Sequence, residues 1–300
     1  MHFLSTPAIS VQSLKNLYQP FGVTLDVLRL DQIHPTVSGN KWFKLKEYVK
    51  QARSQNKHTL LTFGGAYSNH IVATAAASKE LGLQAIGIIR GERSQQLSPS
   101  LLEAAALGME LFFISREAYK LKEIPSEVFM KYTEKDITVV NEGGYGVAGS
   151  LGAATILDYC DSSVYTHFIS AVGTGTTLAG LVRGSAHHQL CIGISVLKNA
   201  LSLKEEIKAL LPPNLHNQFT LLHDYHFGGY AKSNQALFDF MNAWYTNTNI
   251  PSDFVYTGKA FFATDHLIRA GYFPAGSRLL IIHSGGLQGN RSLRKDTLIF

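Results

Sequence analysis

The clearest chemical signal in this sequence is the segment Gly173–Thr177 (GTGTT), which directly follows an apolar run at residues 168–172. Glycines and hydroxyl side chains at a turn from a strand into a helix leave backbone N–H groups free to bind a phosphate. The chain has no GxxxxGK(S/T) phosphate loop, and Leu178 stands where a dinucleotide-binding segment would have its third glycine. The segment therefore predicts a site for a small phosphorylated cofactor.

A lysine that could react with such a cofactor lies in the segment Ser38–Lys41 (SGNK). Lys41 follows a Gly-Asn turn and begins a predicted helix, with Lys44 on the next turn. A helix lysine is usually a solvated surface residue, and its charge is unfavourable at the start of a helix. A bound anion would offset that charge, and burial beside a phosphate-bearing aldehyde would lower the lysine pKa and favour an imine. Both interpretations are open on these residues alone.

A third segment, Thr62–His70 (TFGGAYSNH), combines a strand end, two glycines and a helix start. In the simplest interpretation, Ser68 or Asn69 only caps the alanine-rich helix that follows. In the alternative, Ser68, Asn69 and His70 present hydrogen-bonding side chains at a helix N-terminus, where a carboxylate would bind. Ser68 is not the nucleophile of a GxSxG motif, because its neighbours are Tyr67 and Asn69.

The elements that must position these segments alternate between short apolar runs and longer helical stretches. We expect strands at 25–30, 59–63, 85–89, 111–114, 137–140, 168–172, 192–196 and 279–282. We expect helices at 42–54, 69–81, 98–107, 148–159, 177–185 and 259–269. This order predicts an α/β protein with a mostly parallel, open twisted sheet and helices on its faces, where ligands bind beyond the carboxyl ends of the strands.

Composition limits the class of protein. The 300 residues are 45% hydrophobic and 16% charged, which suits one large α/β unit or two lobes that share a cleft. The net charge of +5 comes from scattered residues without a run of five, so we expect no nucleic-acid partner. Cys160 and Cys191 form no CxxC pair, which favours free thiols and no metal site. The N-terminus has no signal-peptide pattern and the apolar runs are strand-sized, so we expect a cytoplasmic protein without membrane partner.

Together with two later segments, these motifs resemble a known family. In order along the chain they are Ser38–Lys41, Tyr67–His70, Gly173–Thr177, Val255–Lys259 (VYTGK) and His283–Gly286 (HSGG). They are similar to the D-cysteine desulfhydrase and 1-aminocyclopropane-1-carboxylate deaminase family. Its members are fold type II, tryptophan synthase β-like enzymes that depend on pyridoxal 5'-phosphate (PLP).

The resemblance implies a role for each position. Lys41 would hold the cofactor as a Schiff base, with Asn40 as its neighbour in the turn. The phosphate would be bound by Lys44, Gly173, Thr174, Gly175, Thr176 and Thr177. Asn69 would contact the ring hydroxyl of the cofactor and Ser284 its pyridine nitrogen, while Ser68 and His70, next to Asn69, would face the substrate carboxylate. The catalytic residues beside Lys41 would be Ser68, Tyr230 and Tyr256, the two tyrosines lying near the substrate.

Within this family, the residues favour elimination over ring opening. Deaminases that open the cyclopropane ring typically have other residues where this chain has His70, Thr257 and Ser284. A glutamate at position 257 would place a fixed charge near the cofactor ring, which Thr257 cannot supply. The expected reaction is therefore α,β-elimination that converts D-cysteine to pyruvate, hydrogen sulfide and ammonia, with Lys41 as general base. The alternatives are the deaminase, a serine or threonine dehydratase, and a non-catalytic module that binds phosphate or an amino acid.

Two departures from the family pattern are marked and one is mild. Phe43 stands where the family usually has arginine, and Leu287–Phe300 lacks the apolar helix expected there. The mild departure is Ser284, where the desulfhydrases more usually have threonine. The resemblance also implies two lobes, a smaller one at residues 44–151 and a larger one that binds the cofactor at 1–43 plus 152–300. A homodimer is expected, as in other fold type II enzymes.

Overall fold

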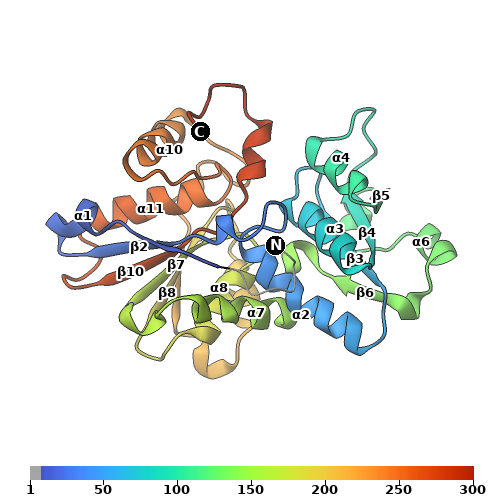
Figure 1. The fold of residues 1–300 in the computed structure, drawn as a ribbon, viewed down its shortest axis with the longest axis horizontal. Helices are drawn as coiled ribbons and strands as arrows, with labels where there is room; N and C mark the ends of the chain where they lie inside the picture. Colours follow the sequence, from blue (N-terminus) through green and yellow to red (C-terminus); the bar gives the residue numbers. More distant parts are fainter. Residues whose placement is uncertain (1–7) are drawn as a thin grey trace.

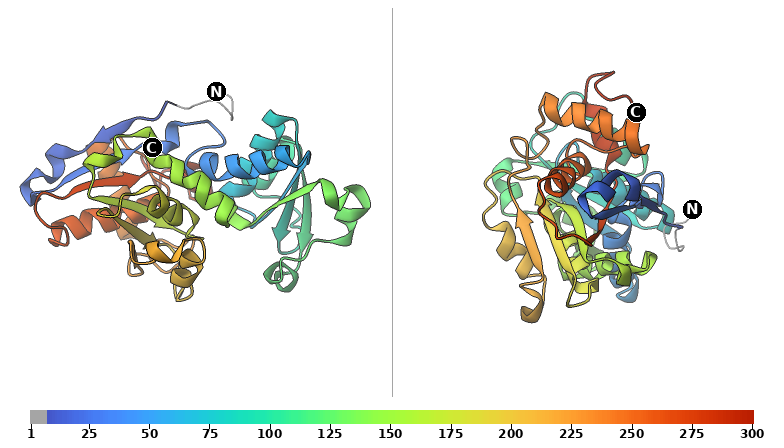
Figure 2. Two further views of the ribbon diagram at one scale, coloured as in Figure 1. Left: turned by 90° about the horizontal axis from the view of Figure 1, so that it is seen from below. Right: turned by 90° about the vertical axis from the view of Figure 1, so that its left-hand side faces the viewer.

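The computed structural model describes residues 8–300 and contains two sheets, each flanked by helices (Figures 1 and 2). The larger sheet has the order β1 (Val11–Ser13), β2 (Thr24–Leu28), β10 (Arg278–Ile282), β7 (His167–Val172), β8 (Leu190–Ser195) and β9 (Phe219–Leu222). All its neighbouring strands are parallel except β1, which runs antiparallel to β2. In this sheet, β2 from near the start of the chain pairs directly with β10 from near its end.

The smaller sheet is parallel throughout and is formed by a continuous part of the chain. Its order is β5 (Met109–Ile114), β4 (Gln84–Arg90), β3 (Thr59–Gly64) and β6 (Ile137–Val140). Apolar residues on one face pack with α3 (Asn69–Leu81) and α4 (Pro99–Ala106), and those on the other face pack with α5 (Arg116–Lys120) and α6 (Ser126–Lys131).

Helices cover both faces of the larger sheet because its strands are apolar on both sides. In β10, Leu279 and Ile281 belong to one apolar cluster, while Leu280 and Ile282 belong to another, as the alternation of side chains along a strand requires. The first cluster includes α1 (Lys15–Tyr18), α10 (Gln235–Thr248) and α11 (Thr257–Arg269). The second includes α7 (Val147–Ala154), α8 (Thr176–Gly184) and α9 (Leu203–Lys208).

Both lobes contribute residues to the second apolar cluster. The helix α2 (Asn40–Ser54) lies between the lobes and packs into this cluster. Trp42 and Phe43 of α2 are fully buried, and the same cluster reaches Leu60 of the smaller sheet and Phe168 of the larger one. The predicted lobe limits at 44 and 151 fall inside α2 and α7, so they divide two continuous helices. The limits themselves stay a prediction.

The strands and helices predicted from the sequence all occur, with ends that differ by a few residues. One helix was predicted too long: α7 ends at Ala154, and the segment Thr155–Tyr159 is a 3₁₀ helix. The sequence analysis did not predict the strands β1 and β9 or the helices α1, α5, α6, α9 and α10. The other 3₁₀ helices lie at Gln19–Phe21, Leu30–Gln32, Glu134–Asp136, Glu142–Gly144, Ser162–Val164, Pro213–Leu215 and Leu287–Ser292. Within residues 8–300, no helix has the length and apolar character that would let it span a membrane.

Candidate active site

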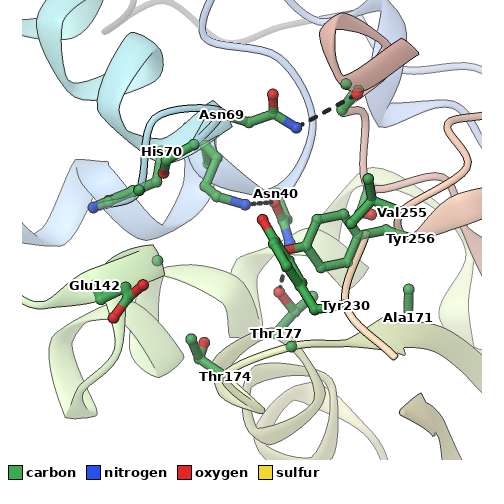
Figure 3. A pocket seen from close by; sticks show the side chains of 18 of the residues that line it. Asn40, Asn69, His70, Glu142, Ala171, Thr174, Thr177, Tyr230, Val255 and Tyr256 are labelled. Atoms are coloured by element: carbon green, nitrogen blue, oxygen red, sulfur yellow. Dashed lines mark hydrogen bonds between the residues drawn. The ribbon is translucent and has the colours of Figure 1, made fainter. Parts of the chain in front are cut away.

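The carboxyl ends of strands from both sheets surround a cavity of ≈ 1110 Å³ (Figure 3). Its walls include the segments that directly follow β3, β6, β7 and β10, the edge at which open parallel sheets bind ligands. The predicted residues that line it are Lys41, Lys44, Ser68, Asn69, His70, Gly173, Thr174, Gly175, Thr177, Tyr230, Tyr256 and Ser284. Thr176 does not line the cavity, because its side chain is fully buried. The sequence segments therefore converge on one site.

Lys41 is held at the start of α2 by a tight backbone approach. Gly39 precedes the helix with φ 67°, and a Cβ there would lie 1.9 Å from the carbonyl oxygen of Ser284, so only glycine fits. The side chain of Asn40 donates a hydrogen bond to Thr177 Oγ1 (2.7 Å) and accepts one from Lys41 Nζ (2.9 Å). Burial lowers the Lys41 pKa to about 8, against the opposing effect of Asp253. The amine is therefore fixed in direction and readily deprotonated.

Lys44 brings a second positive charge to the same wall. It is buried, and its ammonium donates to the carbonyl oxygen of Gly143 at 3.1 Å. Burial and the nearby charge of Lys41 lower its pKa well below the ordinary lysine value. Within residues 8–300, neither lysine forms an ion pair with a carboxylate. A buried pair of ammonium groups without a carboxylate favours a bound anion.

The turn between β7 and α8 provides the backbone donors for such an anion. Gly175 caps α8 with φ 78°, and a Cβ on it would lie 2.3 Å from Ile207 Cγ1. The first N–H groups of α8 have no partner within the helix and point toward its N-terminal end. The hydroxyls of Thr174 and Thr176 lie 3.0 Å apart, so Thr176 supports the turn through a hydrogen bond with Thr174. Any contact of Thr176 with a bound anion would therefore have to come from its backbone N–H.

Ser68 and Asn69 differ in whether their side-chain oxygen atoms already have hydrogen-bond partners. Ser68 caps α3, and its Oγ accepts from the backbone N–H of Ile71 (3.4 Å), as the simpler interpretation of this segment predicted. Asn69 donates from Nδ2 to the carbonyl oxygen of Gly286 (3.4 Å), which links the two lobes (Figure 3). Its Oδ1 is buried without a hydrogen-bond partner in the described chain. An unsatisfied buried amide atom at a cavity wall indicates a missing ligand group.

His70 lines the cavity, but its ring is also engaged by a neighbouring strand. The ring is buried, and its Nε2 lies 2.9 Å from the hydroxyl of Thr62, which itself donates to the carbonyl oxygen of Val140 (2.7 Å). Because that hydroxyl proton is used, His70 Nε2 must be the donor and Nδ1 an unprotonated acceptor. Burial, with the charges of Lys41 and Lys44, lowers the His70 pKa well below its ordinary value. A neutral ring with an unprotonated Nδ1 offers a carboxylate no donor in this state, and the contact of His70 with the substrate carboxylate stays a prediction.

Two tyrosines, Tyr230 and Tyr256, also line the cavity. The rings of Tyr230 and Tyr256 meet edge to face with centroids 5.9 Å apart, and Figure 3 shows them beside Asn40 and Thr177. Burial raises the pKa of both phenols, and that of Tyr256 lies well above the ordinary value. Both tyrosines are therefore protonated at neutral pH and can act as hydrogen-bond or proton donors.

Asp253 is a central residue that the sequence interpretation missed. It is fully buried and accepts hydrogen bonds from the backbone N–H groups of Val255, Tyr256 and Thr257 and from the Thr257 hydroxyl, at 2.7–3.0 Å. Thr257 supplies no charge itself, but its hydroxyl donates a hydrogen bond to the carboxylate of Asp253, which the sequence analysis did not consider. The signal was an aspartate just before a helix start, where such residues cap the helix. Burial raises the Asp253 pKa, while the hydrogen bonds from Thr257 and Tyr256 oppose that rise.

The two marked departures from the family pattern fall in different places. Phe43 is buried in the shared core, where its ring meets Tyr159 edge to face at 5.5 Å, and it does not line the cavity. The C-terminal segment packs on α10, with the rings of Phe300 and Tyr245 4.7 Å apart. Its 3₁₀ helix Leu287–Ser292 contributes Gln288, Gly289 and Ser292 to the cavity wall. Only the second departure therefore reaches the site.

Comparison with known proteins assigns nearly the whole chain to one family. Residues 2–285 match the family model described as pyridoxal-phosphate dependent enzyme. A Pyrococcus abyssi protein named "Putative 1-aminocyclopropane-1-carboxylate deaminase" is 31% identical, with 93% of this chain and 89% of that protein covered. The bifunctional D-cysteine desulfhydrase/1-aminocyclopropane-1-carboxylate deaminase of Arabidopsis thaliana mitochondria is 28% identical, with coverages of 90% and 74%.

The fold comparison agrees with the sequence comparison. A crystal structure described as a homologue of 1-aminocyclopropane-1-carboxylate deaminase superposes with a TM-score of 0.81 and 26% identity, over 97% of this chain and 92% of the other. The predicted resemblance, the α/β fold with mostly parallel sheets and the pyridoxal-phosphate dependence are thereby confirmed.

Proposed function

Because this chain belongs to the pyridoxal-phosphate dependent enzymes, we propose that it is the lyase that releases pyruvate, hydrogen sulfide and ammonia from D-cysteine. The observation that carries this proposal is that Lys41, with a pKa of about 8, and two protonated tyrosines line the same cavity. A base and proton donors in one cavity suit the removal of an α-proton and the departure of a β-substituent.

The described residues fit pyridoxal phosphate. Its phosphate matches the buried amine of Lys44, which has no carboxylate partner among residues 8–300, and the free N–H groups at the start of α8. Its ring hydroxyl matches the unsatisfied amide of Asn69. We propose Lys41, Lys44, Asn69, Ser284 and the turn Gly173–Thr177 as its binding residues. When bound, the group supplies an electron sink for the negative charge left on the substrate α-carbon.

The protein residues account for the proton movements. Neutral Lys41 takes the α-proton, which its low pKa allows without a separate base. The substrate carboxylate binds the backbone N–H groups at the start of α3, near Ser68, because a helix N-terminus favours an anion. Tyr256 or Tyr230 donates a hydrogen bond to the sulfur as the bond from the β-carbon to sulfur breaks and sulfur keeps the electron pair. Water then enters, so that D-cysteine and one water balance pyruvate, ammonia and hydrogen sulfide.

A second candidate is the ring opening of 1-aminocyclopropane-1-carboxylate to ketobutyrate and ammonia. The name of the Pyrococcus abyssi relative and the buried charge of Asp253 favour it. A side-by-side assay with purified enzyme decides between the two, with pyruvate and sulfide measured from D-cysteine and ketobutyrate from the cyclopropane substrate. A ketobutyrate rate above the pyruvate rate would reverse the proposal.

The cofactor attachment is tested separately. Purified protein should be yellow, and borohydride reduction followed by peptide mass spectrometry should find the cofactor on Lys41. A reduced adduct on Lys44 or Lys259 instead would contradict the assignment of Lys41. Assembly as a homodimer stays a prediction.

A further inference from the structure

Arg90 is a charged residue at the cavity that the proposed reaction does not use. It ends β4 and lines the cavity. Its guanidinium lies against the loop that leads to Ser68, since a Cβ on Gly65 would be 3.3 Å from Arg90 Nη2. It also lies over the ring of Tyr119, 5.6 Å from the centroid. Among residues 8–300, no carboxylate forms an ion pair with it.

The neighbouring charges leave Arg90 as an available anion-binding group. Lys122 and Glu142 line the same side of the cavity but form an ion pair with each other at 2.8 Å. Glu206 lines the cavity from α9, where its carboxylate accepts from the Ser202 hydroxyl (2.8 Å). Lys41 and Lys44 lie at the wall assigned to the cofactor. The positive charge of Arg90 is therefore not offset on its own side of the site.

The position of Arg90 points to the side chain of the substrate. The loop Gly65–Ser68 separates it from the start of α3, where the α-carboxylate is placed under the proposed function. Its charge reaches Tyr230, whose pKa it lowers against the larger opposing effect of burial. The cavity of ≈ 1110 Å³ is larger than the roughly 300–1,000 Å³ of most small-molecule sites. Gly65, Arg90 and Tyr230 all line this cavity, so a substrate side chain that extends past the cysteine sulfur toward them remains within it.

We propose that the site accepts D-amino acids whose β-substituent ends in a carboxylate or a similar oxyanion, and that Arg90 binds this group. The planar guanidinium matches a carboxylate with two parallel hydrogen bonds, and its place over an aromatic ring pre-orients it. The inference rests on the proposed β-elimination and specifies its substrate class. For S-carboxymethyl-D-cysteine, Lys41 takes the α-proton, the carbon–sulfur bond breaks with the electron pair on sulfur, and water gives pyruvate, ammonia and thioglycolate.

The test compares S-carboxymethyl-D-cysteine with its carboxamide, which has the same shape and a similar leaving group but no terminal charge. The wild-type enzyme should favour the carboxylate in kcat/KM by about 10- to 100-fold, the range for hydrogen bonds to a charged group. Arg90→Gln should remove this preference, mainly through KM, and should change the carboxamide by less than about threefold. Arg93→Gln is the matched control, because Arg93 lies over Phe113 and does not line the cavity.

Two results would overturn the proposal. Equal losses on both substrates in Arg90→Gln would mean that Arg90 binds the α-carboxylate or shapes the loop. No carboxylate preference in the wild type would mean that no second anion subsite exists. If neither compound yields pyruvate, the elimination itself has failed, and the subsite is then tested by titrating each compound against the absorption band of the bound cofactor. Equal dissociation constants in that titration would refute the subsite independently of turnover.

Discussion

Lys259 offers the sharpest test of how the fold positions the tyrosine pair. It is fully buried in α11, and its ammonium donates to the carbonyl oxygens of His226 and Gly229, both at 2.8 Å. These carbonyls belong to the loop that carries Tyr230. The backbone of this loop has positive φ at residues 227, 228, 229 and 231, so its conformation depends on contacts from outside. Replacement of Lys259 by methionine keeps the apolar stem and removes both hydrogen bonds.

The expected cost follows from the two lost contacts. A hydrogen bond to a charged group contributes roughly 1.5–3 kcal/mol, so two of them set an upper range of about 3–6 kcal/mol. Methionine also avoids the free-energy cost of burying an ammonium group, so part of this loss of stability is recovered. We expect a net loss of about 2–4 kcal/mol, concentrated in the loop at 226–231. A displacement of Tyr230 by about 1 Å would then lower kcat by about 100-fold.

The assay separates a local effect from general unfolding. Lys259→Met should keep its cofactor absorbance while hydrogen exchange at residues 226–231 accelerates and kcat on D-cysteine falls. Lys259→Gln, which keeps one neutral donor, should lie between wild type and methionine, and Lys204→Met on the exposed face of α9 is the control. Unchanged exchange together with unchanged kcat in Lys259→Met would refute the reasoning.

Three further outcomes follow from the site geometry. In the apoenzyme, neutral Lys41 is the reactive form, so stopped-flow capture of the cofactor should speed up with rising pH and level off above about 8. At pH 7 about a tenth of Lys41 is then neutral, roughly 300-fold more than for a lysine with the ordinary pKa. Asp253→Asn should move this midpoint to lower pH, because the Asp253 charge raises the Lys41 pKa. An unchanged midpoint would show that Asp253 does not influence the Lys41 pKa. Gly175→Val should weaken cofactor affinity in equilibrium titrations, since its side chain would collide with Ile207, and unchanged affinity would place the phosphate elsewhere.

The sheets and the main binding segments could be predicted because their signals are local. Short apolar runs mark β3, β6 and β7 within a residue or two, and glycines directly after β7 indicate the turn before α8. The missed helix α10 also has a helical pattern, with buried Leu237, Met241 and Trp244 at spacings of four and three. The sequence alone gave no flanking strand there, and the aromatic and asparagine residues weakened the helix signal.

The features of the site that the sequence did not reveal are contacts between residues that only the fold brings together. The ring of His70 is turned by Thr62, whose hydroxyl is itself engaged by Val140 on the neighbouring strand β6. No spacing along the chain encodes that chain of hydrogen bonds. Arg90 is similar, because an arginine at a strand end is ordinary until the cavity forms beside it.

Asp253 changes the basis on which the two candidate reactions are distinguished. The comparison of Thr257 with a glutamate assumed that the residue at this position decides whether a fixed charge lies near the cofactor. In the fold, Thr257 instead holds a carboxylate from four residues earlier, with its hydroxyl 2.7 Å from Asp253 Oδ1. Ring opening needs the stronger electron sink and so depends on such a charge, whereas departure of a thiolate depends on it less. Loss of the Asp253 charge should therefore affect the two reactions unequally, which the identity of residue 257 alone does not predict.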